Sequence, residues 1–497
     1  MKKRVLRVIT AFAALLSIML VIMMPVRAES MPSEESIEYL RSIMEMVDKK
    51  YSGEVSEEQL LEGALKGIFS QMDAYTTYFT SEEADIFMGN IEGSFEGIGV
   101  YIEKSGDSIV ITDVISLSPA EKAGLMARDV IVSVDGKNVK GCTLEEVVYL
   151  IKGPVGTKTT LGILRGKDLE VKYIEVERGK VIVSPVTLDI IEDIGYIRLE
   201  MFTSGTMEYF TKVMEELEEK KITKVILDLR NNPGGQLDQA VSVARFFVPE
   251  GLITTLTFKD ERLLPEEYYS TQKESKYKLV VLVNENSASA SEIVAGAVQD
   301  REAGIIVGKK TFGKAKVQNL IPVLTPEASQ KYNVKYGKWY VDAYELSMEQ
   351  GINIMTDEIL GWIKMTTGMY LTPKGRLIDG YGITPDIEID NPDDIEYYDA
   401  KNIRKLSVTW KPDLGDEGSD VYFAEKMLKL IGYEVDEPDT ILDEKTFKAI
   451  NDFRTNMGLY PGGVLDFTTQ KTLNNEYYKK LLEIDKQLAK AVEILSE

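Results

Sequence analysis

The strongest constraint on the fold is an alternation of strand-like and helix-like segments that begins near residue 183. The apolar runs "IGYIRLEMF", "KVILDLR" and "KLVVLVN" are followed in turn by the helical patterns "GTMEYFTKVMEELEEKK", "LDQAVSVARFF" and "SEIVAGAVQD". Strands joined by crossover helices give an α/β sheet, whose ligands lie beyond the carboxyl ends of the strands. We therefore predict an α/β core over residues 179–400, with the loops "RNNPGG" and "ENSASAS" at its functional edge.

The residue pattern on either side of this core differs from that of the core. A chain of 497 residues is long enough for several domains. Residues 29–92 carry apolar residues at helical period, which predicts a helical region that acts as a cap or as a dimerisation element. Residues 93–178 consist of short β-rich runs separated by glycine and two short helical patterns, which predicts a compact β domain. A Lys/Tyr/Glu-rich stretch, 326–361, interrupts the core.

The C-terminal part reads as a further small α-helical domain over residues 404–476. A D-x-x-T pattern occurs twice, at Asp443 to Thr446 and at Asp466 to Thr469, and each copy opens an apolar helical pattern. Asp and Thr are favourable first-turn residues, so two capped helices are predicted. Residues 477–497 are expected to form a separate charged helix with a solvated or partner-facing surface.

The N-terminus predicts export across the cytoplasmic membrane. A basic start is followed by an apolar run from Val8 to Met24, and then by Val26 and Ala28 at cleavage spacing. We expect a signal peptide over residues 1–28, with an uncleaved membrane anchor as the alternative. The extracytoplasmic chain has one cysteine, Cys142, and so no internal disulfide. The net charge of −23 argues against nucleic-acid partners and leaves peptides and glycans open.

The chain contains no histidine. This excludes a Ser-His-Asp triad, a Cys-His dyad and an imidazole zinc site, and the single cysteine excludes thiolate clusters. A nucleophile in this chain would need a lysine, a carboxylate or a terminal amine as its base. We expect neither a metal nor a cofactor.

Three serines alternate in "NENSASASEIVAGAVQD", residues 284–300. The strongly structured flanks argue against a flexible linker. Ser289 and Glu292 fit a capping box at a helix start, and this structural interpretation is compatible with a nucleophile. A side chain at a strand-to-helix turn is exposed at the sheet edge, where backbone amides such as that of Ala290 can stabilise an oxyanion.

Two further loops carry candidate residues. "VGKKTFGKAKVQ" resembles a phosphate-binding loop but has Ala315 where a hydroxyl is needed, and no clear helix follows, so nucleotide binding is disfavoured. Lys314 in this loop is either a solvated cation or a partly buried base whose pKa is lowered by desolvation. The glycine pair 234–235 of "LDLRNNPGG" is either a simple turn or a close backbone approach with an oxyanion donor.

Taken together and in this order, these motifs resemble the carboxyl-terminal processing peptidases, the tail-specific serine proteases of the Ser-Lys type. The resemblance covers nearly the whole chain, and it implies a PDZ domain over 93–178 and a protease core of the tail-specific, crotonase-like type. The motifs that carry it are "FEGIGV", "SPAEKAGLMARDVIVSVDGKNV", "IKGPVGT", "DLRNNPGG", "SASASE", "TFGKAKVQ" and "TPKGRLIDGYGITPDIEI".

The resemblance also implies the roles of individual residues. Ser289 corresponds to the nucleophile, Lys314 to its general base 25 residues later, and Gln318 to the residue that orients the lysine. The oxyanion donors map to the Ala290 amide and the pair Gly234 and Gly235, and the PDZ amides that meet a substrate carboxylate map to Gly97, Ile98 and Gly99.

The C-terminal segment resembles peptidoglycan-binding repeats, which would tether the enzyme to the cell wall. The chain departs from the family in having Ala315 and Lys316, where Gly and Thr usually follow the lysine. A non-catalytic PDZ and wall-binding scaffold is the competing hypothesis, although the intact Ser289, Lys314 and Gln318 argue against a decayed site. A glycan hydrolase lacks paired carboxylates placed by any motif.

Overall fold

The computed structural model describes residues 33–497 except 106–107, 116–117, 166–169, 260–262 and 393–394. The expected signal segment, residues 1–28, lies outside the described residues. The chain divides into two compact units, residues 1–74 and 75–497. Within the described part of the chain, none of the helices has both the length and the apolar character needed to cross a membrane.

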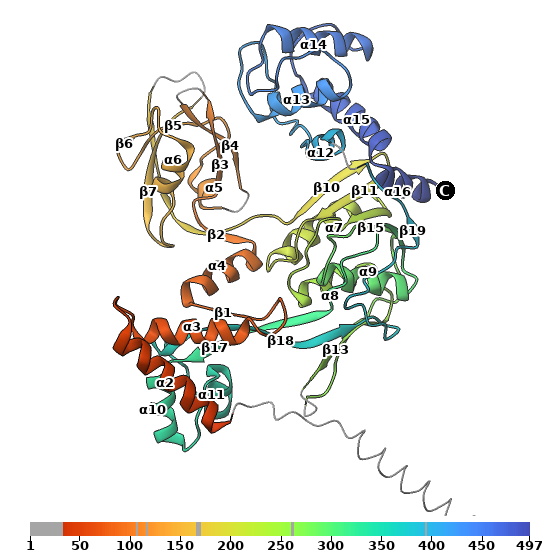
Figure 1. Cartoon of the computed structure of the whole chain (residues 1–497). Helices are drawn as coiled ribbons and strands as arrows, with labels where there is room; N and C mark the ends of the chain where they lie inside the picture. The colour runs from red at the N-terminus through yellow and green to blue at the C-terminus, as the bar shows by residue number, and fades with distance from the viewer. Residues whose placement is uncertain (1–32, 106–107, 116–117, 166–169, 260–262, 393–394) are drawn as a thin grey trace, which may run out of the picture. The chain divides into compact units, whose positions relative to one another are not determined.

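The centre of the second unit is a six-stranded sheet of order β10-β11-β12-β15-β16-β19 (Figure 1). Only the first pair is antiparallel, and the strands from β11 to β19 run parallel to one another. This confirms the predicted α/β core, with "RNNPGG" and "ENSASAS" at the same edge of the sheet. The strands span Val186–Ile191, Ile194–Leu199, Lys224–Asp228, Lys278–Val283, Ile305–Gly308 and Ile387–Glu388.

One face of this sheet is covered by the crossover helices α7 (Thr206–Glu219), α8 (Leu237–Ala244) and α9 (Ala290–Asp300). Because side chains alternate along a strand, Val225 and Leu227 of β12 pack against these helices, whereas Ile226 points to the opposite face. Burial on both faces explains why the strands read as continuous apolar runs.

The opposite face is covered by the end of the chain, which corrects the expectation of a solvated or partner-facing helix over 477–497. Helix α16 (Lys486–Ser496) packs against β15, β12 and β16, and it buries Leu488, Ala491 and Leu495 (Figure 1). Helix α15 spans Phe467–Ile484, so the boundary expected after residue 476 lies inside a helix. The amphipathic pattern of this helix is present, and its partner is the six-stranded sheet.

A second, antiparallel sheet has the order β1-β18-β13-β14, and β17 also pairs with β18. Its strands span Thr77–Phe79, Ile359–Leu371, Gly251–Phe258, Glu266–Ser270 and Lys316–Leu324. Between β17 and β18, helices α10 (Pro326–Tyr336) and α11 (Ala343–Gln350) and the short helix η1 (Thr356–Glu358) form most of the stretch 326–361. This stretch has a core cluster of its own around Tyr332, Tyr340 and Leu346.

The expected N-terminal helices are α2 (Glu34–Lys50) and α3 (Glu57–Phe69) in the first unit, and α4 (Ser81–Glu92) in the second. The β domain that follows contains a sheet of order β3-β4-β5-β7-β8, with β6 paired to β5 and with helices α5 and α6. Strand β3 is at its edge. The elements are β3 Val100–Ser105, β4 Ser108–Val114, α5 Pro119–Ala123, β5 Val130–Val134, β6 Lys137–Asn138, α6 Leu144–Ile151, β7 Lys158–Leu164 and β8 Lys172–Glu177. The flanking strands β2 (Ser94–Gly97) and β9 (Gly179–Ile182) pair with each other.

The C-terminal domain contains α12 (Ile395–Lys401), α13 (Ser419–Leu430), α14 (Glu444–Asn456) and α15. Both predicted caps are present. The amide of Thr446 donates to Asp443 Oδ1 at 2.7 Å, and the amide of Thr469 donates to Asp466 Oδ1 at 2.8 Å. The two D-x-x-T patterns therefore mark helix starts, as the sequence predicts.

The packing between α13 and α14 predicts a pH effect on stability. Burial raises the pKa of the Glu425 carboxyl to about 7, although it accepts hydrogen bonds from the Thr446 hydroxyl and the Asp439 amide. A carboxyl whose pKa is raised in the folded state stabilises the fold below its unfolded pKa. That contribution is lost as the pH rises to about 7, by at most about 3 kcal/mol.

We therefore expect Glu425→Gln to lose less stability than the unsubstituted chain between pH 4.5 and pH 8. Unfolding midpoints measured across this range, with the exposed Glu437→Gln as the control, check the prediction. Parallel pH profiles for the unsubstituted chain and Glu425→Gln would contradict it.

Candidate active site

Ser289 lies where the chain leaves β15 and enters α9. Its backbone has φ 55° and ψ −113°, a conformation that residues other than glycine rarely adopt. Such strain persists only where the surroundings enforce it, and it is common at functional sites. Ser289 is half-buried, whereas Ala288 and Ala290 beside it are buried. The turn thus presents one side chain at the edge of the sheet.

The two neighbouring serines have structural roles. Ser287 and Ser291 are fully buried, and their hydroxyls donate to the carbonyls of Leu229 at 2.8 Å and Asn232 at 3.0 Å. Both bonds tie the serine turn to the loop that follows β12. Ser287 lies in the loop before the helix, whereas Ser291 lies in the first turn of α9.

The glycine loop lies directly against the serine turn. A Cβ added to Gly234 would lie 2.7 Å from Ser289 Cβ and 3.0 Å from the Ala290 nitrogen. The Gly234 amide donates to Asn232 Oδ1 at 2.9 Å, so it is already engaged. Among the described residues, no acceptor is assigned to the amides of Gly235 and Ala290. The Gly235 and Ala290 amides therefore stay the candidate oxyanion donors, and Gly234 supplies the close approach of the two loops.

Glu292, in the first turn of α9, joins the serine turn to the lysine loop. Its side chain is fully buried and accepts four hydrogen bonds. Burial raises the pKa of the Glu292 carboxyl, and these hydrogen bonds oppose that rise. The predicted cap is present, but it also holds two loops together. The four donors to the Glu292 carboxylate are the amide of Ser289 at 2.8 Å, the hydroxyl of Thr311 at 2.6 Å, and the amides of Gly313 at 2.7 Å and Lys314 at 2.8 Å.

Tyr370 of β18 makes a second connection between the same two loops. Its hydroxyl donates to the carbonyl of Ser289 at 2.8 Å and also contacts the carbonyl of Lys314. Burial raises the pKa of Tyr370 far above its ordinary value, so the hydroxyl keeps its proton. Two buried side chains, one from α9 and one from β18, therefore determine the distance between the backbones of Ser289 and Lys314.

The Lys314 side chain itself points to another partner. Its Nζ lies 4.5 Å from the centroid of the Tyr75 ring, a cation–π distance, and Lys316 Nζ lies 5.7 Å from the same ring. The structure thus brings the serine turn and the lysine loop together through Glu292, and the Lys314 ammonium lies over the Tyr75 ring.

Gln318 lies just beyond a β-bulge between Val317 and Gln318 in β17. Its side-chain amide donates to the carbonyl of Lys316 at 3.2 Å and to Thr366 Oγ1 at 3.4 Å. Bulges are common next to active sites, where they re-aim a side chain. The side chain is held on the β17–β18 pair, and its role in orienting Lys314 stays a prediction.

The predicted carboxylate loop of the β domain, Gly97 to Gly99, connects β2 to the edge strand β3. It is anchored through its carbonyls: that of Ile98 accepts from the Ala120 amide at 2.7 Å, and that of Gly99 accepts from the Ile115 amide at 3.0 Å. Ile98 is buried in the core of the β domain. The loop therefore directly precedes β3, the strand whose outer edge is not paired within the sheet.

Sequence reasoning did not identify Asn232, Thr311 or Tyr370 as site residues. Asn232 and Thr311 lie inside the quoted motifs "DLRNNPGG" and "KKTFGK", so their position beside a candidate residue was an available signal. Tyr370 lies 56 residues after Lys314 and carries no local signal. Only the pairing of β17 with β18 brings it to the site.

Comparison with known proteins agrees with this arrangement. Residues 193–389 match "Peptidase family S41", residues 110–165 match "PDZ domain", and residues 417–473 match "Putative peptidoglycan binding domain". The carboxy-terminal processing protease CtpA of Bacillus subtilis is 32% identical over 471 residues, which cover 93% of this chain and 91% of the relative.

Two further proteins are similar to this chain. A "Probable CtpA-like serine protease" of Staphylococcus epidermidis is 31% identical over 90% of this chain and 82% of its own length. The solved photosystem II D1 C-terminal processing protease is 27% identical, with 72% of this chain and 89% of that chain covered and a TM-score of 0.39. The chain belongs to the carboxy-terminal processing proteases of peptidase family S41 and is a serine peptidase.

Proposed function

We propose that this protein is an exported endopeptidase that cleaves other proteins near their C-termini, with Ser289 as the nucleophile and Lys314 as its general base. The observation that carries the proposal is the strained turn of Ser289, packed against Gly234 and joined by the buried Glu292 to the backbone of Lys314. Ser287 and Ser291 are committed to backbone carbonyls, which leaves Ser289 as the nucleophile of the three.

In the proposed reaction, neutral Lys314 accepts the Ser289 proton as the hydroxyl oxygen attacks a peptide carbonyl. The negative charge on the carbonyl oxygen is stabilised by the amides of Ala290 and Gly235. Lys314 then protonates the leaving amine, and an acyl-enzyme forms on Ser289. Water activated by the same lysine hydrolyses the ester and regenerates the serine. The reaction requires no cofactor.

We further propose that the dyad is assembled only when substrate binds, under control of the PDZ domain. The position of Lys314 over the Tyr75 ring supports this view, because a cation–π contact stabilises the protonated lysine. Assembly then requires the lysine side chain to leave Tyr75 and turn toward Ser289. Gln318, held by Thr366 on the neighbouring strand, is placed to orient the lysine after that movement.

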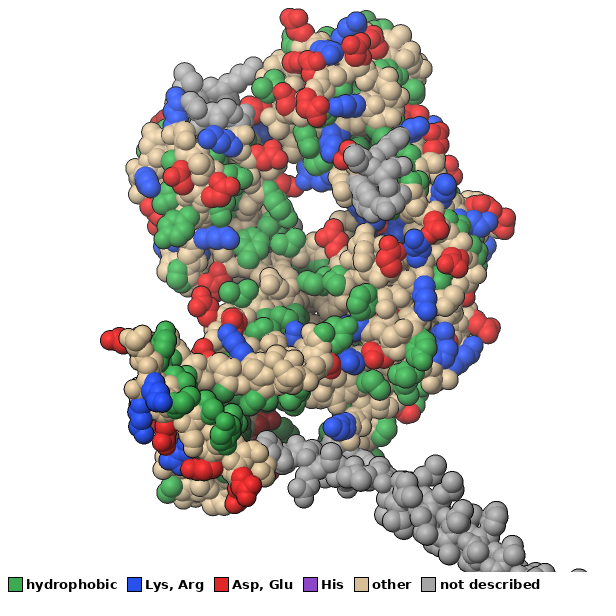
Figure 2. Space-filling model, viewed as in Figure 1, with side chains coloured by type: hydrophobic (Ala, Val, Ile, Leu, Met, Phe, Trp, Pro, Cys, Tyr) green, Lys and Arg blue, Asp and Glu red, His purple; other side chains and the backbone are tan. Residues whose placement is uncertain are grey.

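The substrate tail is proposed to bind along β3 by strand addition. Strand β3 is an edge strand, and α6 packs near it. Gly97, Ile98 and Gly99 directly precede β3, so we propose that their amides bind the terminal carboxylate of the substrate. The match to a peptidoglycan binding domain supports cell-wall glycan as a second partner and an extracytoplasmic location. Figure 2 shows Lys and Arg interspersed with Asp and Glu on the visible face, which gives no support to a nucleic-acid partner.

The test is hydrolysis of a fluorogenic peptide with a free C-terminal carboxylate by the unsubstituted chain, Ser289→Ala and Lys314→Ala. We expect both substitutions to reduce kcat by about 10⁴-fold or more, because neither the nucleophile nor the base has a substitute. A peptide with the same sequence and an amidated C-terminus should be cleaved with a higher KM. Equal turnover by all three chains would favour the non-catalytic PDZ and wall-binding scaffold.

The first unit is proposed to mediate homodimer formation. Helix α2 buries none of its residues, and its apolar side chains Ile37, Leu40 and Met46 are 57%, 60% and 46% exposed. Burying such a face against a second copy removes it from water. We expect Leu40→Glu to lower the mass measured by light scattering to that of a monomer, whereas Ser42→Glu on the same helix leaves the dimer intact. A monomeric unsubstituted chain would contradict the proposal.

A further inference from the structure

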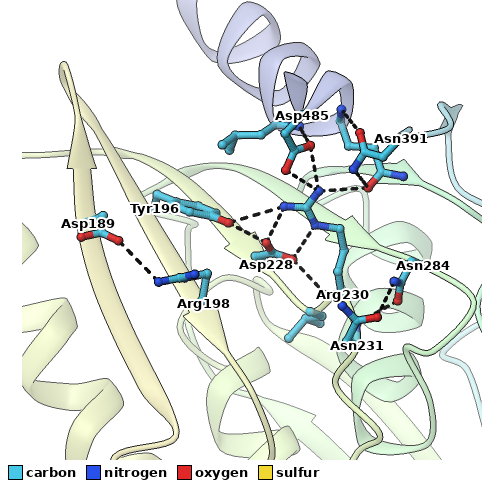
Figure 3. A network of polar contacts seen from close by, with 12 residues as sticks. Asp189, Tyr196, Arg198, Asp228, Arg230, Asn231, Asn284, Asn391 and Asp485 are labelled. Atoms are coloured by element: carbon cyan, nitrogen blue, oxygen red, sulfur yellow. Dashed lines mark hydrogen bonds and ion pairs between the residues drawn. The ribbon is translucent and has the colours of Figure 1, made fainter. Parts of the chain in front are cut away.

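The C-terminal helix contributes to a buried polar network behind the active site (Figure 3). At its centre is Arg230, whose side chain is 1% exposed and which lies two residues after the end of β12. Its Nε and Nη2 donate to the two carboxylate oxygens of Asp228 at 2.9 and 2.7 Å. Its Nη1 donates to Asp485 at 2.9 Å and to Gln487 at 3.1 Å, and both acceptors belong to the start of α16.

Contacts of both its backbone and its side chain hold Asp485 in this position. It is 1% exposed and lies between α15 and α16, and its Oδ1 also accepts from the Leu488 amide at 2.9 Å, which caps α16. The apolar face of α16 is buried in the same core as the catalytic strands. Because both the backbone and the side chain of Asp485 are held, it offers Arg230 a rigid, charged partner.

The loop that begins at Arg230 is the one that packs against the nucleophile. Asn231, with φ 60°, exchanges hydrogen bonds with Asn284 at 2.8 Å in each direction, and Asn284 belongs to the loop that leads to Ser289. The carbonyl of Asn232 accepts from the Ala288 amide at 3.0 Å. A continuous set of contacts therefore runs from Asp485 through Arg230 to the turn that holds Ser289.

We propose that Asp485 is a positioning residue for catalysis: through Arg230 it fixes the loop that carries Gly234 and Gly235, so the C-terminal helix is a working part of the protease. This inference rests on the proposed function of that loop. Its physical basis is that Arg230 has three donor groups in a rigid fork, and a single carboxylate, that of Asp228, satisfies only two of them. Without Asp485, Nη1 keeps only the neutral Gln487 as its acceptor, and the fork and the loop that follows it are held less firmly.

The experiment measures kcat and KM on the tail peptide for the unsubstituted chain, Asp485→Asn and Glu493→Gln, with rates normalised to active sites titrated by an acylation burst. For Asp485→Asn we expect kcat per titrated site to fall about 10- to 100-fold with KM within about twofold, because the donor geometry is displaced while tail binding is not. Glu493→Gln, on the exposed face of the same helix, should match the unsubstituted chain. Normalisation removes the effect of a partly unfolded sample.

A double-mutant cycle with Arg230→Met separates positioning from simple stabilisation of α16. If Asp485 acts through Arg230, adding Asp485→Asn to Arg230→Met should change kcat by less than about twofold. If Asp485→Asn does not fold, Gln487→Leu, which removes the other α16 acceptor, should still lower kcat per site. If Asp485→Asn and Gln487→Leu keep the full turnover that depends on Ser289, the role of Asp485 is wrong and the proposed function still stands. Equal turnover by the unsubstituted chain and Ser289→Ala would instead overturn the proposed function, and the inference with it.

Discussion

Replacing Glu292 by glutamine is expected to lower kcat on tail peptides by about 100-fold or more, with a loss of stability. The glutamine amide has nearly the same shape, but one of its two ends carries N–H donors. Whichever way it turns, that end faces groups that are themselves donors: Ser289 and Lys314 at one oxygen, Thr311 and Gly313 at the other.

Each buried N–H left without an acceptor costs about 1 to 3 kcal/mol, and the cost falls on the contacts that hold the serine turn against the lysine loop. A factor of 100 in rate corresponds to about 2.7 kcal/mol, which the loss of the two bonds at the amide end of the glutamine supplies. Steady-state kinetics with thermal unfolding checks the expectation. Glu285→Gln is the matched control, since Glu285 is exposed in the loop before the serines. Comparable losses in the two variants would show that the effect is not due to the four-bond carboxylate.

The second large effect is expected for Gly234→Ala, which should also reduce kcat by about 100-fold. Gly234 has φ 106°, and an added Cβ would lie 2.7 Å from Ser289 Cβ and 2.8 Å from the Ala288 carbonyl oxygen. The clash is with the backbone and with Ser289, the proposed nucleophile, so relief requires the glycine loop and the serine turn to separate. A misplacement of about 1 Å at such a site costs on the order of 10²-fold in rate.

Gly432→Ala isolates the steric part of this prediction. Gly432 has φ 95°, and nothing lies within 4 Å of an added Cβ. It should therefore lose about 1 to 2 kcal/mol of stability from backbone strain alone and keep full activity. Measuring kcat and unfolding midpoints for both variants gives the comparison. Full activity in Gly234→Ala would refute the packing that places the glycine loop against Ser289.

The α/β core and the compact β domain of residues 93–178 were predictable because their signals are local and periodic, whereas the PDZ identity of the β domain was implied by the family resemblance. The strand runs of the core are apolar throughout because both faces of the sheet are buried. The two Asp caps of the C-terminal domain were predictable for the same reason, since a cap depends on residues within one turn. The serine, the lysine and the glycine pair were found as motifs before their proximity was known.

What sequence reasoning placed incorrectly was the end of the chain. The pattern of α16 shows that one face is apolar, but an amphipathic pattern does not identify the partner of that face. The partner is a group of strands that lie far earlier in the chain, and it includes Ile226 of β12 and Leu282 of β15. Arg230 was likewise read only as part of a loop motif, although its counter-charge Asp485 lies 255 positions away.

By itself, the sequence determined that any catalytic base had to be something other than histidine, because the chain contains none, and it determined the order of strands, helices and candidate residues along the chain. Only the tertiary structure decided which two of the three serines donate their hydroxyls to backbone carbonyls, which glycine amide is already engaged, and that Lys314 lies over the Tyr75 ring. The physical reason is that capping and periodicity act within a few residues. Hydrogen bonds in a buried network, in contrast, join groups that meet only after the sheets have formed.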